Sequence, residues 1–111
     1  LLVGEGIETV LSLVTAVPEI TAAAALSAGS LGAFSPPPAC HRLVIARDND
    51  FEGAWAAERL ARRCAQAGVA AAVIVPEGGD FNDDLASLGA AVLAARLGPL
   101  FRSAGGGEEQ A

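Results

Sequence analysis

The chain contains no lysine, and all seven of its basic residues are arginine. The absence of lysine excludes a phosphate-binding loop of the Walker type, whose lysine reaches the β- and γ-phosphates. It also excludes chemistry that passes through a lysine Schiff base. A phosphatase site with Asp48 as nucleophile and Asp50 as acid is disfavoured for the same reason, because such a site needs a lysine to steady the phosphoryl group.

Cysteine and histidine are scarce as well. The two cysteines, Cys40 and Cys64, form no CxxC pair, and His41 is the single histidine. We interpret the cysteines as free thiols in a reducing cytoplasm rather than as a disulfide. His41 follows three consecutive prolines, so we expect a solvated loop residue there rather than a metal ligand.

No apolar run is long enough to cross a bilayer, since Pro18, Glu19 and Gly29 interrupt the best stretches. No basic region precedes the apolar N-terminus, so we expect no signal peptide, no membrane partner and a cytoplasmic location. Hydrophobic residues make up 52% of the 111 residues, which predicts one folded domain. The chain begins with Leu1 instead of methionine, inside an expected strand, and this indicates a fragment of a longer polypeptide.

Strand-like and helix-like segments alternate along the chain. The spacing of Ile7, Val10, Leu11 and Val14 is that of the buried face of an amphipathic helix, which ends at Pro18. The Gly-rich end of the chain predicts a folded domain over residues 1–102 and a disordered tail over residues 103–111. We expect strands at 1–3, 20–26, 43–46 and 69–75, further helices at 53–66 and 82–97, and a Gly/Ser/Pro-rich connection at 27–38.

This alternation predicts an α/β fold of the Rossmann-like kind, with a mainly parallel four-stranded sheet flanked by helices. With right-handed crossovers the simplest strand order is 2-1-3-4, which makes the first and third strands neighbours where the order reverses. In a parallel sheet every strand-to-helix loop emerges along one edge, and ligands bind there.

The net charge of −6 argues against a broad basic surface for nucleic acid, but the acids are not spread evenly. Each of three acidic stretches follows an expected strand, so all three fall on the same edge of the sheet. Carboxylates that converge without counter-ions repel one another, and a hard divalent cation such as Mg²⁺ or Mn²⁺ relieves the repulsion. Seven of the thirteen acidic residues lie in these stretches: Glu5, Glu8, Asp48, Asp50, Asp80, Asp83 and Asp84.

Simpler interpretations exist for each stretch alone. Asp48 to Asp50 and Asp80 to Asp83 can cap the helices that follow them, and Glu8 can be an ordinary first-turn acid. The Gly4-Glu5-Gly6 run does not fit the dinucleotide fingerprint, because the third glycine of that pattern is replaced by Thr9 and Glu5 would repel a pyrophosphate.

On the helix expected at 53–66, Trp55 is interpreted as a core anchor. Arg59, Arg62 and Arg63 are interpreted as a solvated face, with contact to a backbone phosphate as the alternative.

Three segments in order resemble the motifs of Toprim domains. "VGEGIETVLS" resembles the first motif, a hydrophobic strand followed by Glu-Gly and a second acid. "VIARDNDFEG" resembles the Asp-x-Asp motif with its following glycine, here Gly53. "VPEGGDFNDDL" resembles the Pro-x-Gly-x-Asp-x-Asp segment of bacterial and phage primases, and the resemblance extends to about Leu97.

The resemblance implies roles for these positions. Glu5 matches the glutamate that acts as general acid and base, and Asp48 and Asp50 match the principal Mg²⁺ ligands. The matching position for a second aspartate in the third motif is Asn82, which departs from the primase pattern. The further metal candidates are Glu8, Asp80 and, as a substitute for that second aspartate, Asp83. Arg47, the arginine nearest to the acids in the sequence, is a candidate for substrate binding.

The expected function is therefore that of the catalytic Toprim domain of a DNA primase, which makes RNA primers by Mg²⁺- or Mn²⁺-dependent nucleotidyl transfer. The resemblance is closest to phage- and plasmid-type primase-helicases. It implies a DNA template and nucleoside triphosphates as partners of the full-length protein, and a linked helicase or zinc-binding domain. A Toprim-type metal-dependent nuclease and a non-catalytic assembly module remain alternatives.

Overall fold

The computed structural model describes the backbone of residues 1–110 and the side chains of residues 1–101. Strands and helices alternate as far as the fourth strand, after which two helices follow in succession. In chain order the elements are β1 (Leu2–Gly4), α1 (Ile7–Ala16), β2 (Ala22–Ala24), α2 (Ala28–Ala33), β3 (Arg42–Ala46), α3 (Phe51–Gln66), β4 (Ala70–Ile74), α4 (Phe81–Leu88) and α5 (Ala90–Gln110).

The four strands form one parallel sheet in the order β2-β1-β3-β4, as the alternation predicts. Gly4 pairs with Ala24 on one side and with Ala46 on the other, and Ala46 pairs in turn with Ile74. These four residues end their strands in step. The loops that follow them therefore leave the sheet side by side at one edge.

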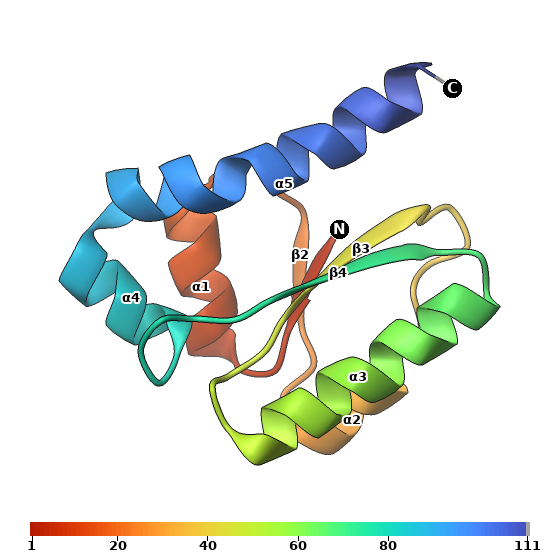
Figure 1. The fold of residues 1–111 in the computed structure, drawn as a ribbon, viewed down its shortest axis with the longest axis horizontal. Helices are drawn as coiled ribbons and strands as arrows, with labels where there is room; N and C mark the ends of the chain where they lie inside the picture. Colours follow the sequence, from red (N-terminus) through yellow and green to blue (C-terminus); the bar gives the residue numbers. More distant parts are fainter. Residues whose placement is uncertain (111) are drawn as a thin grey trace.

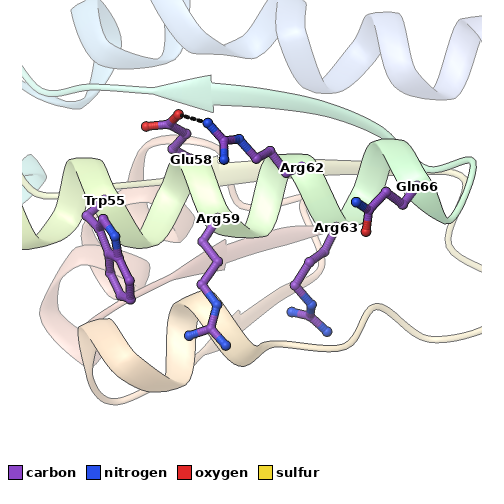
Figure 2. Close-up of a pocket in the computed structure, with 6 residues that line it drawn as sticks. All are labelled: Trp55, Glu58, Arg59, Arg62, Arg63 and Gln66. Atoms are coloured by element: carbon purple, nitrogen blue, oxygen red, sulfur yellow. Dashed lines mark hydrogen bonds and ion pairs between the residues drawn. The ribbon is translucent and has the colours of Figure 1, made fainter.

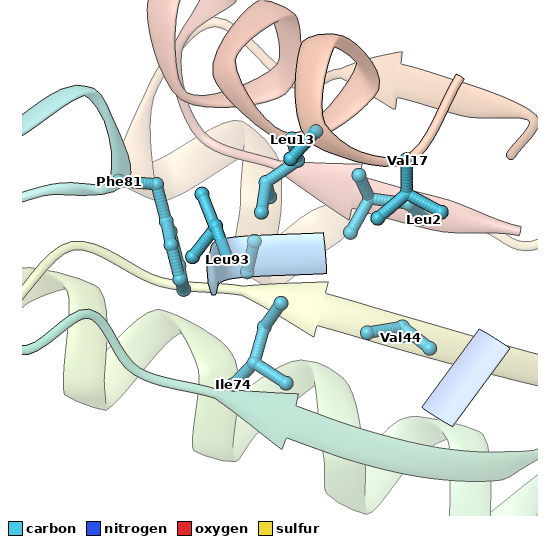
Figure 3. Packing of buried hydrophobic residues seen from close by; sticks show 9 residues of the cluster. Leu2, Leu13, Val17, Val44, Ile74, Phe81 and Leu93 are labelled. Atoms are coloured by element: carbon cyan, nitrogen blue, oxygen red, sulfur yellow. The ribbon is translucent and has the colours of Figure 1, made fainter. Parts of the chain in front are cut away.

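Helices cover both faces of the sheet, with α1, α4 and α5 on one face and α2 and α3 on the other (Figure 1). Successive strand residues point to opposite faces, so Leu2 and Val44 belong to the first core and Val3 and Ile45 to the second. Figure 3 shows the first core, in which Leu13, Phe81 and Leu93 from the three helices pack over the strand residues. Both cores are almost entirely aliphatic.

The end of the chain differs from the prediction of a single helix at 82–97. α4 stops at Gly89, which has a φ of 86° and donates its backbone N–H to the carbonyl oxygen of Leu85. This left-handed conformation favours glycine and ends the helix. α5 then runs through Pro99 instead of ending before it. The disordered tail predicted for residues 103–111 lies outside the residues whose side chains are described.

The buried face of α1 includes Val10, as predicted, but differs from the prediction at two other positions. Ile7 and Leu11 are more than half exposed, whereas Thr9 and Ser12 are buried beside Leu13. The helix packs on the sheet and on α4 at once, so its buried side is rotated toward those two neighbours. The position of α4 could not be predicted from the apolar periodicity of this segment alone.

Trp55 is 53% exposed, so its interpretation as a core anchor is wrong. Both cysteines are free and His41 is exposed, as expected. In the described part of the chain, no helix has the length and apolar character that crossing a membrane requires.

Candidate functional site

The pairing of β1 with β3 brings the first two acidic stretches together. Gly4 lies opposite Ala46, and the next residues of the two loops are Glu5 on one side and Arg47 and Asp48 on the other. The β2 loop closes over the same point, where the Leu26 N–H donates to the Glu5 carbonyl oxygen at 2.6 Å. The topological switch point is therefore occupied by carboxylates.

The Glu5 carboxyl group has little compensation in this position. Its Oε2 atom is buried and has no hydrogen-bond partner among the described residues. Burial raises the pKa of Glu5. The negative charge of Asp48, and the hydrogen bond that protonated Glu5 can donate to it, raise the pKa further, with smaller contributions from Asp50 and Glu52. The negative charges of Asp48 and Asp50 thus oppose the ionisation of Glu5.

Arginine does not relieve this repulsion. The ion pairs found among the described side chains are Arg62 with Glu58 and Arg96 with Glu77, and neither touches the switch point. Arg47, expected as a substrate-binding residue, donates its Nε to the backbone carbonyl oxygen of Asp48 at 3.1 Å. Its role here is to hold the loop, and its guanidinium forms no ion pair with an acid of the cluster in the described structure.

Asp48 is held by helix α1. Thr9 Oγ1 donates to Asp48 Oδ1 at 3.2 Å, and the threonine is 4% exposed. The start of α3 also presses on this loop, because a Cβ at Gly53 would lie 2.8 Å from the Asp48 carbonyl oxygen and 2.9 Å from Asp50 Oδ1. Only glycine fits there, which gives a steric reason for the glycine that follows the two aspartates.

Asp50 caps the N-terminus of α3, where its Oδ1 accepts the Gly53 N–H at 2.6 Å. Asp80 does the same for α4, accepting the Asp83 N–H at 2.8 Å. The capping interpretation is therefore correct for both aspartates. Capping uses one oxygen of each carboxylate, so it does not exclude a second role for the other.

The loop between β4 and α4 is fixed by two residues that the sequence did not single out for this purpose. Asp84 is 3% exposed, and its two carboxylate oxygens accept the N–H groups of Glu77 and Gly78, each at 2.8 Å. Asn49 joins this loop to the β3 loop: its N–H donates to the Gly79 carbonyl oxygen at 3.0 Å, and its Nδ2 to that of Gly78 at 3.2 Å. The signal for Asp84 was present in the sequence, as an extra acid in the first turn of a helix.

A cavity of about 330 Å³ opens between these loops. Glu8, Asp48 and Asp80, one from each acidic stretch, contribute to its wall, so the predicted meeting of the three stretches at one edge is correct. Its full lining is Gly6, Ile7, Glu8, Thr9, Leu26, Asp48 and Asp80.

Two residues of the third stretch, the metal candidate Asp83 and the substituted position Asn82, do not line this cavity. Asp83 turns toward the loop glycines, with its Oδ2 at 3.1 Å from where a Cβ of Gly79 would be. Asn82 accepts a hydrogen bond from Ser12 Oγ at 3.4 Å. Over the described residues, no three acidic, histidine or cysteine side chains come close enough together to hold a metal ion. The acids share an edge, but their carboxylates point to helix caps as well as to one another.

The donor chemistry of the site nevertheless fits a hard divalent cation. Its groups are carboxylate oxygens without thiol or imidazole, which is the ligand type that Mg²⁺ and Mn²⁺ prefer. Among the described residues Glu5 Oε2 has no hydrogen-bond partner, and the like charges of Glu5 and Asp48 repel; a cation would relieve both. A divalent cation fits this site because the donors are carboxylate oxygens and because they lie at the same edge of the sheet.

A comparison with known families agrees with this arrangement. The sequence model described as Toprim domain matches residues 1–91. Neither curated proteins nor solved structures give a significant match. Toprim domains occur in metal-dependent enzymes that act on nucleic acids, and the parallel sheet with acids at its switch point has the α/β architecture of that fold. The chain belongs to the Toprim domain family.

Proposed function

We propose that this chain is the catalytic domain of a DNA primase, which forms RNA primers by Mg²⁺- or Mn²⁺-dependent nucleotidyl transfer. The observation that carries the proposal is the position of the Glu5 carboxyl group. It lies near Asp48 and Asp50, and its buried Oε2 has no hydrogen-bond partner among the residues that the structure describes. The order of the three acidic stretches, with Gly53 behind the Asp-x-Asp pair, supports the same assignment.

In this proposal Asp48 and Asp50 are the principal residues that would hold the cation. Glu8 and Asp80 complete the acidic wall of the cavity, and Asp83 is the weakest candidate because it turns toward the loop glycines. A divalent cation bound there would polarise the phosphoryl oxygens of the substrate and neutralise the charge that develops on them.

The chain's own residues supply orientation and proton transfer. Glu5 is the proposed general base, which accepts the proton of the attacking hydroxyl. Burial and neighbouring charges raise the pKa of Glu5, and a base with a raised pKa holds that proton more firmly. Thr9 holds one oxygen of Asp48, and the Asn49 and Asp84 hydrogen bonds keep the loop of Asp80 in place.

The test is an activity assay on the full-length protein. Purified protein is incubated with a single-stranded DNA template, ribonucleoside triphosphates and Mg²⁺ or Mn²⁺, and the products are separated by length. We expect short RNA primers from the wild type and none from Glu5→Gln. Glu19→Gln, which removes an exposed acid from the turn after α1, serves as the matched control and should leave synthesis intact.

The same reactions decide between priming and its alternatives. Shortening of a labelled DNA strand in the absence of nucleotides, lost in Glu5→Gln, would assign the site to a nuclease and overturn the primase proposal. A protein that neither extends nor cleaves, and binds no Mn²⁺, would be an assembly module. We also propose that the full-length protein binds a DNA template and nucleoside triphosphates, and that it carries a linked helicase or zinc-binding domain.

A further inference from the structure

Two aromatic side chains stand out on the first two turns of α3. Phe51 is 85% exposed and Trp55 is 53% exposed. The core beneath this helix is filled by Ala56, Ala57 and Leu60, so neither aromatic ring is needed there. Exposed aromatic rings of this size call for another explanation.

Arginines continue the line from Trp55. Trp55, Arg59 and Arg63 are spaced four residues apart and project from the same side of α3, toward α2 (Figure 2). The guanidinium carbon of Arg59 lies 5.6 Å from the centre of the Trp55 ring, a cation–π contact. Arg63 donates to the carbonyl oxygens of Gly32 and Phe34 at 2.9 and 2.8 Å, which anchors α2 beside α3.

Three adjoining hollows follow the same line. The first, of about 420 Å³, includes Phe51 and Trp55; the second, of about 460 Å³, runs from Trp55 to Gln66. The third, of about 410 Å³, shares Arg63 and Gln66 with the second and continues to Pro36. Neighbouring hollows share lining residues along α3, and we call the three together the α3 groove.

The lining of the α3 groove contains three arginines and two acids, whereas acids outnumber basic residues in the chain as a whole. Three of the seven arginines of an acidic chain lie within five positions of α3. Glu52 and Glu58 are the acids of this lining, and Glu58 is neutralised by its ion pair with Arg62 (Figure 2). Aromatic faces followed by arginines are the combination on which single-stranded nucleic acids bind, with bases on the rings and phosphates beside the guanidinium groups.

We propose that the α3 groove binds a single-stranded nucleic acid, with a base stacked on Trp55 and the backbone passing Arg59. The inference rests on the proposed function for the role of that strand, and it adds the path by which the strand reaches the acids. α3 begins directly after Asp50, and its 16 residues span ~24 Å. A strand in the groove therefore runs from the helix toward the acidic edge of the sheet.

The experiment uses Trp55 as its own probe, because it is the only tryptophan in the chain. The protein is titrated with short oligo(dT) at low salt in EDTA, and Trp55 fluorescence and the anisotropy of the labelled oligonucleotide are followed together. We expect saturable quenching of Trp55. Trp55→Ala should weaken binding about tenfold or more, and Trp55→Phe should restore part of the affinity.

The charged part of the groove is tested by Arg59→Gln. This variant should weaken binding and reduce the slope of log affinity against log salt by about 0.7, the value for one phosphate contact on a single strand. Arg96→Gln is the matched control, because it removes an arginine from α5 and should leave affinity and quenching unchanged. Circular dichroism of each variant checks that the fold is retained.

The proposal is overturned by binding without Trp55 quenching, by equal losses in Arg59→Gln and Arg96→Gln, or by duplex DNA binding as tightly as the single strand. Quenching that depends on protein concentration alone would assign the groove to self-association and overturn it too. Because the titration contains no divalent cation, its failure leaves the metal-dependent function standing. Conversely, loss of Mn²⁺ binding would leave the groove assignment intact.

Discussion

Thr9 and Asp48, 39 residues apart in the sequence, are joined by a hydrogen bond of 3.2 Å between the threonine hydroxyl and the carboxylate. The bond links the first helix to the loop after the third strand, across the point where the strand order reverses. Thr9 is buried although it is polar. Its partner explains this, because the hydroxyl gives Asp48 one fixed oxygen beside the cavity.

Replacement of Thr9 by valine should lower the free energy of unfolding by about 1 kcal/mol, because an isosteric side chain removes one hydrogen bond. It should also weaken Mn²⁺ binding, since Asp48 loses its orientation, whereas Thr9→Ser should retain both properties. The control is Thr15→Val, whose exposed hydroxyl bonds only the Leu11 carbonyl oxygen within α1. Urea denaturation and Mn²⁺ titration measure the two effects; equal metal affinity in Thr9→Val and wild type would contradict the role given to Thr9.

Gly53→Ala should destabilise the fold by about 1–3 kcal/mol. The added methyl group would meet the Asp48 carbonyl oxygen at 2.8 Å, so the loop of the two aspartates has to shift. Gly29→Ala is the matched control: it lies in α2 with only Ser27 Oγ as near as 4.0 Å, and should stabilise the helix slightly. Thermal denaturation of both variants decides, and a Gly53→Ala protein as stable as wild type would refute the steric argument.

Asp84→Ala should cost about 2–4 kcal/mol of stability, because it removes a buried carboxylate that accepts the N–H groups of both Glu77 and Gly78. Hydrogen exchange should become faster at those two amides and at Gly79, on the loop that carries Asp80. Asp83→Ala, one residue earlier and exposed, should change little. Similar exchange rates in the two variants would mean that Asp84 does not hold the loop.

The strand order and the edge on which the acids meet could be predicted from the sequence. Both follow from the alternation of strands and helices and from right-handed crossovers, which determine the strand order even when the strand bounds are inexact. The pairing of Gly4 with Ala46 then places Glu5 near Asp48 without further information. The direction of each carboxylate could not be predicted. Asp50 and Asp80 both cap a helix, but only Asp80 also lines the cavity, and the sequence pattern is the same for both.

The errors have physical causes of the same kind. The apolar spacing of Ile7 and Leu11 predicted the buried side of α1, but the polar residues Thr9 and Ser12 are buried instead. Thr9 donates to Asp48, and Ser12 donates to the Glu8 carbonyl oxygen within the helix and lies beside Asn82. Residues far away in the sequence lie beside these polar side chains, so the polar side of α1 can be buried. Trp55 was assigned to the core by its size, although the alanines behind it already fill that space.

Glu5→Gln should stabilise the metal-free protein near neutral pH. The pKa of Glu5 is raised in the folded chain above its ordinary value of 4.5, so the folded state binds this proton more tightly than the unfolded state. Stability is therefore lost as the pH rises through the folded-state pKa, and the loss is absent below the unfolded value.

Glutamine does not ionise, so the gain from Glu5→Gln should disappear below about pH 4. Melting temperatures across pH in EDTA measure this, with Glu19→Gln as the control for net charge. A gain that persists unchanged at low pH would show that ionisation of Glu5 is not its cause.

Mn²⁺ titration calorimetry on the wild type, Asp48→Asn and Asp50→Asn tests the central claim most directly. We predict that the wild type binds Mn²⁺ and gains thermal stability from it, and that both variants lose the binding. Without metal, Asp48→Asn should melt at a temperature equal to or a few degrees above wild type, because a repulsive charge is gone. A wild-type chain that binds no Mn²⁺, or variants that bind it as tightly as wild type, would contradict the account.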